Sequence, residues 1–273
     1  MHQTKLRLLP RRECLSFLLL GTLAFVPVIG IAQDPVESDS SSALKDRFTK
    51  LAERITVSAA GPPKTKLTRL EQPVLSWSNP ERNTTVGALH LWTRTGRPEA
   101  ALCIYPSLEK VHLEFQSLST SQLLANDSDR LIWQPNQPGV NWKDLPDTAP
   151  PLKSPYQRLR QMRSIGRRFS AKLVPPNRPS IPLRVLERPI YRYPNHTGGD
   201  VIDGAVFSFV QGTDPEVLLL LEAYESGDEH RYRYTLARMS VVPTEVTIDN
   251  TTVWETSWAV QRSYTPYYVY ETK

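Results

Sequence analysis

One pattern occurs twice in this chain of 273 residues and constrains its fold more than any other feature. Residues 87–105 read GALHLWTRTGRPEAALCIY, and residues 204–222 read GAVFSFVQGTDPEVLLLLE. Each stretch begins with Gly-Ala, alternates apolar residues up to an aromatic, turns, and restarts at Pro-Glu as a second apolar run. Alternation on both sides of a short turn predicts an antiparallel hairpin. The sequence therefore predicts two copies of one hairpin.

The correspondence extends beyond the hairpins on both sides. Upstream, LEQPVLSW (70–77) aligns with LERPIYRY (186–193). Downstream, LIWQ (131–134) aligns with TVWE (252–255). The spacing between partners grows slowly along the chain, as small loop insertions would produce. This pattern predicts a duplicated unit.

An amphipathic helix is expected before each set of strands, because apolar residues recur there with helical spacing. In 42–55 these residues are Leu44, Phe48, Leu51 and Ile55. In 154–173 they are Leu159, Met162, Ile165, Phe169 and Leu173. Ser154 and Pro155 suit the N-cap and first position of the second helix. Both helical segments are followed by Pro-Pro.

Together these elements predict an α+β fold, a tandem duplication of a helix-plus-antiparallel-sheet unit. By analogy of layout only, such a unit is similar to cystatin-like and nuclear-transport-factor-like folds. The expected domains are a first α+β repeat at 43–150 and a second at 151–273.

The N-terminus has the features of an export signal. Lys5, Arg7, Arg11 and Arg12 precede a largely apolar stretch, and small residues favour cleavage after Ala32. We expect 1–32 to be a signal peptide and the acidic, Ser-rich segment 33–42 to be a disordered linker. The protein would then be exported, either periplasmic or secreted. The alternatives of an uncleaved anchor and of a twin-arginine signal remain open.

Removing 1–32 changes the charge balance. The chain has 33 Lys and Arg against 28 Asp and Glu, and this segment holds four of the former and one of the latter, which leaves a net charge of +2. A nucleic-acid partner is therefore not expected, because it requires a strong basic field. Only Cys103 remains after cleavage, so no intramolecular disulfide is expected.

The runs GALHLWTRTGRPEA and HLEFQSLS, with the later GAVFSFVQGTDPEVLLL, resemble an uncharacterised family of exported proteins from planctomycete-type bacteria. The resemblance covers most of the mature chain. It implies bacterial export and no particular activity.

His112 and Glu114 are the candidate catalytic residues. On a strand they point to the same side and could transfer a proton. A solvent-facing polar row on an amphipathic strand explains the pair equally well. No third ligand of metal-binding spacing accompanies them, so neither a metal nor a cofactor is expected. Motifs for nucleotide binding, zinc proteases, haem attachment and α/β-hydrolases are absent from the sequence.

The second predicted helix, 154–173, carries six cationic residues and no acidic one. Its candidate binding residues are Arg160, Arg163, Arg167 and Arg168. They predict either contact with an anionic surface, such as a membrane, or a solvated helix face.

Other reactive residues have a structural interpretation. Cys103 and His90 align with Leu220 and Phe207, which favours a buried role for both. Carboxylates beside Gly198-Gly199 and in the second hairpin could act in acid-base chemistry, but are also ordinary turn residues. These are Asp200, Asp203, Asp214 and Glu216.

We therefore expect a non-enzymatic binding or structural module of the cell envelope, with partner and oligomeric state open. The first alternative is a hydrolase-type enzyme with a site at the repeat junction, drawing on His112, Glu114 and the 200–203 loop. The second is peripheral association with a membrane surface through the Arg-rich helix.

Overall fold

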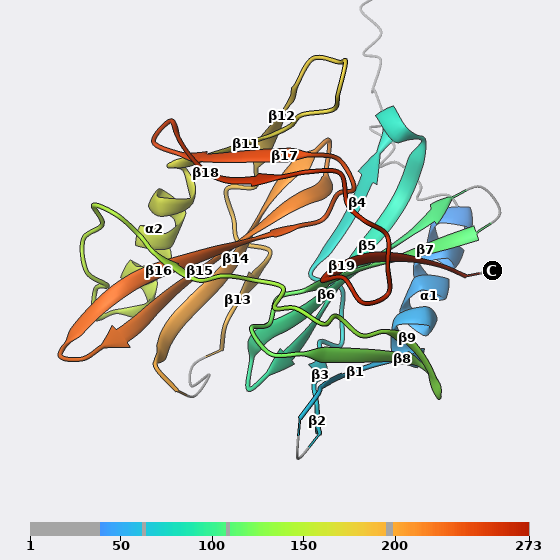
Figure 1. Ribbon diagram of the computed structural model, residues 1–273, viewed down its shortest axis with the longest axis horizontal. Helices are drawn as coiled ribbons and strands as arrows, with labels where there is room; N and C mark the ends of the chain where they lie inside the picture. Colours follow the sequence, from blue (N-terminus) through green and yellow to red (C-terminus); the bar gives the residue numbers. More distant parts are fainter. Residues whose placement is uncertain (1–38, 62–63, 108–109, 195–198, 273) are drawn as a thin grey trace, which may run out of the picture. The chain divides into compact units, whose positions relative to one another are not determined.

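The protein is mostly β-sheet (Figure 1). The computed structural model describes residues 39–61, 64–107, 110–194 and 199–272. Of the described residues, 53% lie in strands and 13% in helices. They form two α-helices and antiparallel sheets, with a half-barrel. The predicted α+β fold of repeated helix-plus-sheet units is therefore wrong. The predicted signal peptide lies outside the described residues, as does the linker up to residue 38, whereas its last residues begin α1 (Asp39–Arg54).

Two sheets are built mainly from the first half of the chain. In one, the hydrogen-bonded order is β19-β7-β6-β5-β3, with β4 also pairing with β5, and in the other it is β2-β1-β8-β9. The bounds are β1 (Ile55–Ala59), β2 (Thr65–Lys66), β3 (Thr68–Arg69), β4 (Leu75–Asn79), β5 (Thr84–Arg94), β6 (Arg97–Ser107), β7 (Lys110–Ser117), β8 (Leu123–Asp127), β9 (Arg130–Trp133) and β19 (Tyr267–Thr272). A short 3-10 helix, η1 (Pro80–Arg82), connects β4 to β5.

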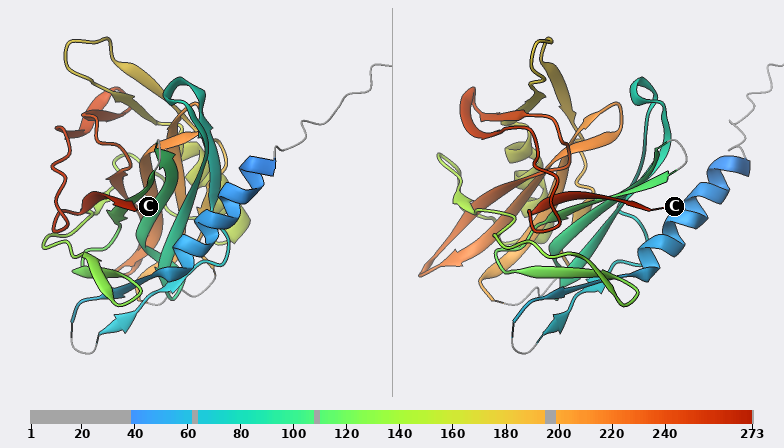
Figure 2. Two further views of the ribbon diagram at one scale, coloured as in Figure 1. Left: turned by 90° about the vertical axis from the view of Figure 1, so that its right-hand side faces the viewer. Right: turned by 45° about the vertical axis from the view of Figure 1, so that its right-hand side comes forward.

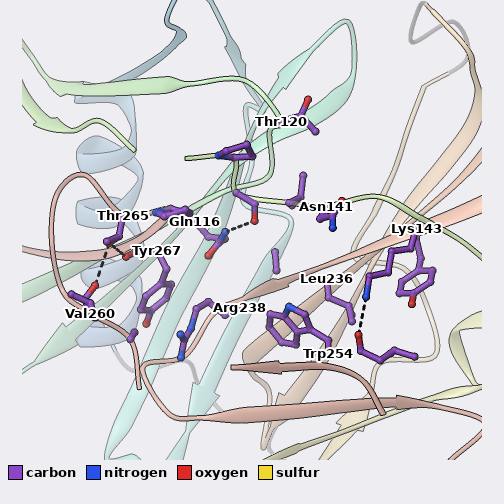
Figure 3. Close-up of a pocket in the computed structure, with 18 residues that line it drawn as sticks. Gln116, Thr120, Asn141, Lys143, Leu236, Arg238, Trp254, Val260, Thr265 and Tyr267 are labelled. Atoms are coloured by element: carbon purple, nitrogen blue, oxygen red, sulfur yellow. Dashed lines mark hydrogen bonds between the residues drawn. The ribbon is translucent and has the colours of Figure 1, made fainter. Parts of the chain in front are cut away.

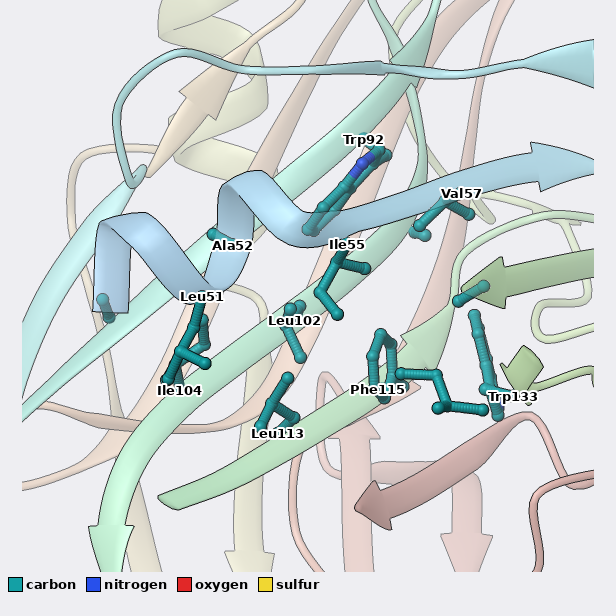
Figure 4. Close-up of a cluster of buried hydrophobic side chains, with 14 of the residues drawn as sticks. Leu51, Ala52, Ile55, Val57, Trp92, Leu102, Ile104, Leu113, Phe115 and Trp133 are labelled. Atoms are coloured by element: carbon teal, nitrogen blue, oxygen red, sulfur yellow. The ribbon is translucent and has the colours of Figure 1, made fainter. Parts of the chain in front are cut away.

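Helix α1 packs on one face of β5, β6 and β7 (Figures 2 and 4). Phe48, Leu51 and Ala52 form its apolar stripe, and Ile55, the first residue of β1, continues it. Trp92, Leu102 and Phe115 meet this stripe from the sheet, and Trp133 closes the same core from β9. Phe115 and Trp133 stack with ring centroids 5.2 Å apart.

The second half of the chain forms a larger sheet, with the order β10-β16-β15-β14-β12-β11-β17-β18 and β13 paired to β14. Its strands are β10 (Lys143–Asp144), β11 (Phe169–Leu173), β12 (Ile181–Val185), β13 (Tyr191–Arg192), β14 (Val201–Gln211), β15 (Asp214–Ser226), β16 (Glu229–Arg238), β17 (Thr244–Ile248) and β18 (Thr251–Thr256). Helix α2 (Pro155–Gly166) covers one face through Met162 and Ile165, which pack with Phe207 and Phe209.

A third core joins the two large sheets. It contains Leu89, Leu91 and Cys103 from the first sheet together with Leu218 and Leu220 from the second. These residues alternate along their strands with the residues that face α1 or α2, so each sheet is apolar on both faces. This core explains the nearly continuous apolar runs of the two hairpins.

Both predicted hairpins are present, as β5–β6 and β14–β15. The glycine that opens each Gly-Ala pair lies under an aromatic ring, from β4 in the first hairpin and from the residue after β13 in the second. A Cβ at Gly87 would lie 2.2 Å from the ring of Trp77, and one at Gly204 would lie 2.4 Å from the ring of Tyr193. Only glycine permits this approach of ring to backbone.

The predicted second helix is too long. It ends at Gly166, and Phe169–Leu173 forms β11, which pairs with β12 on one side and β17 on the other. Phe169 and Leu173 fit a helical spacing, but Phe169, Ala171 and Leu173 also fit the period of a strand. Pairing with β12 and β17 makes this segment a strand rather than a continuation of the helix. In the part of the chain that the structure describes, no helix has the length and apolarity to cross a membrane.

Two short segments connect the halves of the chain. β10 (Lys143–Asp144) precedes the predicted division at 150/151 but pairs with β16 in the second sheet. β19 (Tyr267–Thr272) comes from the C-terminus but forms the edge of the first sheet beside β7. Residues 37–273 cluster as one compact unit. The division into domains at 150/151 stays a prediction.

Candidate functional site

A pocket of about 720 Å³ is lined by residues from both of these segments, Lys143 of β10 and Tyr267 of β19 (Figure 3). Its residues come from the end of β7, the connection between β9 and β10, the strands β16 and β18, and the segment that leads into β19. The pocket therefore depends on parts of the chain that are far apart in sequence.

Apolar side chains form most of the wall. Tyr234 and Leu236 point into it from one face of β16, and Val253 and Trp254 border it from β18. The segment before β19 closes another side with Val260, which is 62% exposed and so presents apolar surface at the rim.

Gln116 supplies an unusual polar group to this wall. Its side chain is 2% exposed, and its Nε2 donates to the carbonyl oxygens of Ser117 (2.7 Å) and Gly139 (3.4 Å). Its Oε1 accepts no hydrogen bond from any of the described residues. Figure 3 shows this amide on the side of the pocket where Tyr267 and Arg238 lie. A buried acceptor without a donor is costly, so this atom is suited to meet a donor from outside the chain.

Two cationic side chains also line the pocket. The Arg238 Nε donates to the Ser240 carbonyl (2.8 Å), and its Nη2 donates to three further carbonyl oxygens, of Val241, Val242 and Ser257. The Arg238 guanidinium lies 5.2 Å from the ring centroid of Tyr267, and burial lowers its pKa. Lys143 Nζ donates to the Val253 carbonyl at 3.0 Å.

The predicted pair His112 and Glu114 lies beside a second, smaller pocket of about 470 Å³. Both residues are on the face of β7 that points toward the second sheet, together with Gln116. Glu114 is 5% exposed and accepts a hydrogen bond from the Tyr267 hydroxyl, so the solvent-facing interpretation is wrong for it. His112 Nε2 lies 3.2 Å from Glu271 Oε1. Tyr267 lines both pockets and separates the two sets of polar residues.

Carboxylates from the second sheet join Glu114 in this region. Arg82 pairs with Asp214 at 3.3 Å and with Glu216 at 2.7 Å. Burial raises the pKa of Asp214 to about 6 and that of Glu216 to about 7, in the latter case with Asp214 adding to the effect. Burial also raises the pKa of Glu114 well above its usual range. Among the described residues, no group of three or more His, Cys, Asp or Glu side chains could hold a metal ion.

The carboxylates of the 200–203 loop do not belong to this site. Asp203 is buried and paired with Arg158 and Arg192, both at 2.9 Å. Asp200 pairs with Arg233 at 2.7 Å. Neither carboxylate lines the pocket of His112 and Glu114, so this part of the predicted enzyme site is not assembled.

Cys103 and His90 are buried, as their alignment with apolar residues predicted. Both are fully inaccessible, and burial raises the pKa of the Cys103 thiol. Neither ring nitrogen of His90 has a hydrogen-bond partner among the described residues. Burial lowers the pKa of His90 to about 4, so its ring is neutral at physiological pH.

The arginines of the predicted second helix are largely engaged within the chain. Arg163 donates to the Glu187 carbonyl at 3.2 Å, and Arg168 pairs with Asp249 at 2.7 Å. Arg160 and Arg167 are exposed, and their side chains form no hydrogen bond or ion pair within the described ranges. Arg160 and Arg167 form a small cationic surface compared with the six cationic residues in 154–173.

Sequence reasoning missed Gln116, Lys143, Arg238 and Trp254 as site residues. Gln116 follows His112 and Glu114 at intervals of two residues, which places all three on one face of β7. This spacing was the signal by which the sequence could have indicated Gln116 as a site residue. For Lys143 and Arg238 no local signal exists, because the segments that surround them come from the other end of the chain.

Comparison with known proteins finds no match: no family model, no curated protein and no solved structure is similar to this chain.

Proposed function

We propose that this protein is an exported, non-enzymatic binding protein whose ligand is a small, largely apolar molecule held in the pocket at β7, β16 and β18. The observation that carries the proposal is Gln116 Oε1, a buried acceptor in a largely apolar wall that lacks a donor in the part of the chain described. A ligand N–H or O–H group would satisfy it and remove the cost of leaving it unpaired.

The size and composition of the pocket support the same proposal. A volume of about 720 Å³ is within the range of small-molecule sites, and the half-buried Trp254 and the exposed Val260 offer apolar surface. The basic and apolar N-terminal segment and the resemblance to exported planctomycete-type proteins support a place in the cell envelope or outside the cell.

A neutral fluorescent probe tests the proposal. N-phenyl-1-naphthylamine has an apolar body and one N–H donor, and its emission rises on entering an apolar site. We expect saturable binding to the purified protein. Val253→Trp, which fills the pocket from β18, should weaken binding about tenfold or more, since the ligand loses its contact surface.

The matched control is Val174→Trp, because Val174 is 39% exposed and lies outside the pocket. It should bind the probe as the unaltered protein does. Binding that is absent, or unchanged by Val253→Trp in a folded protein, would contradict the proposal.

A hydrolase acting at the smaller pocket is the second candidate. One observation favours it: His112, Glu114 and Asp214 line the same cavity. Carboxyl groups with raised pKa values are suited to general acid catalysis near neutral pH. Turnover of chromogenic esters or glycosides that Glu114→Gln abolishes, with the fold intact, would support this candidate and displace the binding role.

A further inference from the structure

The charged groups of the larger pocket all have one sign. Lys143 and Arg238 line it, and no Asp or Glu is among its lining residues in the described part of the chain. The carboxylate that comes nearest in the sequence of β7 is Glu114, which lies on the other side of Tyr267 and bonds the Tyr267 hydroxyl. The pocket therefore has positive charge that its own lining residues do not neutralise.

Both cations retain unused donors. Lys143 Nζ gives one hydrogen bond, to the Val253 carbonyl, and an ammonium group has three N–H donors. Arg238 uses Nε and Nη2, whereas its Nη1 forms no hydrogen bond with any described residue. An incoming acceptor can therefore bind either cation without displacing the carbonyl oxygens.

The apolar surface lies between these donors. Figure 3 shows Trp254 between Lys143 on one side and Arg238 on the other, with the Gln116 amide on the Arg238 side. An apolar body packed on Trp254 would thus have a cation at either end, and the buried acceptor Gln116 Oε1 near one of them.

Resting on the proposed function of this same pocket, we infer that its ligand is an amphipathic anion. Its apolar body packs on Trp254. A carboxylate, sulfonate or phosphate group accepts from Lys143 or Arg238, and an N–H or O–H group of the ligand donates to Gln116 Oε1. Charge-assisted hydrogen bonds of this kind are about twice as strong as neutral ones, so the anionic group adds affinity as well as orientation.

Two dyes that differ in one group test this inference. 1-Anilinonaphthalene-8-sulfonate and N-phenyl-1-naphthylamine share their rings and their N–H donor, and the first adds a sulfonate. We expect the sulfonate to bind about tenfold more tightly at low ionic strength, and this advantage to shrink as salt is added. Val253→Trp should weaken both dyes, which places both in the pocket rather than on surface cations.

A charge variant isolates the cation. Lys143→Met should weaken binding of the sulfonate about threefold more than binding of the neutral dye, because Lys143 is exposed and its loss mainly removes charge. The exposed Lys153 lies outside the pocket, so Lys153→Met is the matched control and should change neither dye. Arg238 donates hydrogen bonds to four backbone carbonyl oxygens, so its replacement would also disturb the fold. Its contribution is therefore tested through the salt dependence of dye binding to the unaltered protein.

The outcomes separate the two claims. Equal affinity for both dyes, or a Lys143→Met effect of the same size on both, overturns the anionic ligand and leaves the binding function standing. A folded protein that binds neither dye overturns the binding function and this inference with it.

Discussion

Glu216 is expected to weaken the fold at neutral pH. It is completely buried on β15, and among the described residues its charged form pairs with one cation, Arg82, which Asp214 also uses. Burial raises its pKa to about 7 from the ordinary 4.5. Replacing it by Gln keeps the shape of the side chain and removes the charge. Glu216→Gln should therefore stabilise the protein where the carboxyl group is ionised.

The sign and size follow from linkage between protons and folding. Below pH 4.5 Glu216 is protonated in both the folded and the unfolded chain, so it has no effect on their balance. Between pH 4.5 and about 7 the unfolded chain releases the proton and the folded chain retains it, so the free energy of unfolding falls as pH rises. The difference between a pKa of 4.5 in the unfolded chain and about 7 in the folded chain corresponds to about 3 kcal/mol of unfolding free energy. The folded protein has lost this whole amount above pH 7.

Urea or guanidinium unfolding of both proteins at pH 4.5, 6 and 8 measures this effect. Taking the difference between variant and unaltered protein cancels every other group that titrates independently. Glu216→Gln should match the unaltered protein within about 1 kcal/mol at pH 4.5 and exceed it by about 2 to 3 kcal/mol at pH 8.

The exposed Glu255 provides the control, since Glu255→Gln should change stability by less than about 0.5 kcal/mol at every pH. A difference for Glu216→Gln that is independent of pH would refute the reasoning. So would a variant that is less stable at pH 8, because the ion pair with Arg82 would then outweigh the cost of burial.

Two further substitutions test the packing of the first sheet. Gly87→Ala places a Cβ 2.2 Å from the Trp77 ring and should cost about 1 to 3 kcal/mol in thermal or urea unfolding, whereas Gly61→Ala, with no atom within 4 Å of the new Cβ, should cost little. His90→Leu removes two buried nitrogens without partners and should raise the free energy of unfolding by about 1 to 2 kcal/mol at pH 7. Because the pKa of His90 is lowered to about 4, the unaltered protein also loses stability as pH falls from 6.5 toward 4, and this loss should be absent from the variant.

Local patterns predicted much of the strand content correctly. The central hairpins were expected at 87–105 and 204–222, and β5–β6 and β14–β15 occur there. The turn between β5 and β6 has positive φ at Thr95 and Gly96, in the backbone region that such short hairpins require. Alternation is a property of neighbouring residues, which explains why it can be recognised without knowing the fold.

The predicted fold class was wrong because several strands are too short to be recognised in the sequence. Strands such as β1, β11 and β17 are only five residues long, too short for alternation to stand out, and β1 follows α1 without a break. β1 pairs with β8, and β11 pairs with β17, so each of these strands depends on a partner that is distant in the sequence. Because these strands were not predicted, the sequence analysis gave the helices a larger share of the structure than they have.

The candidate site was predicted only in part. His112 and Glu114 were identified as a pair on one strand face, and they do line a cavity. The residues that complete the two pockets are distant: Tyr267 meets Glu114 across 153 residues, and Arg82 meets Asp214 across 132. The predicted carboxylates Asp200 and Asp203 are instead neutralised by arginines elsewhere.

Residue spacing alone was enough to predict the apolar faces of the helices, the turns of the two central hairpins, and the burial of Cys103 and His90. These features depend on spacing within a few residues. Three features depend on the packing of the whole chain: β19 pairs with β7, the two large sheets bury both of their faces, and one pocket is lined by Gln116, Lys143, Arg238 and Trp254. Hydrogen bonds along a sheet edge are available to any strand of compatible length, so packing of the whole chain selects the partner.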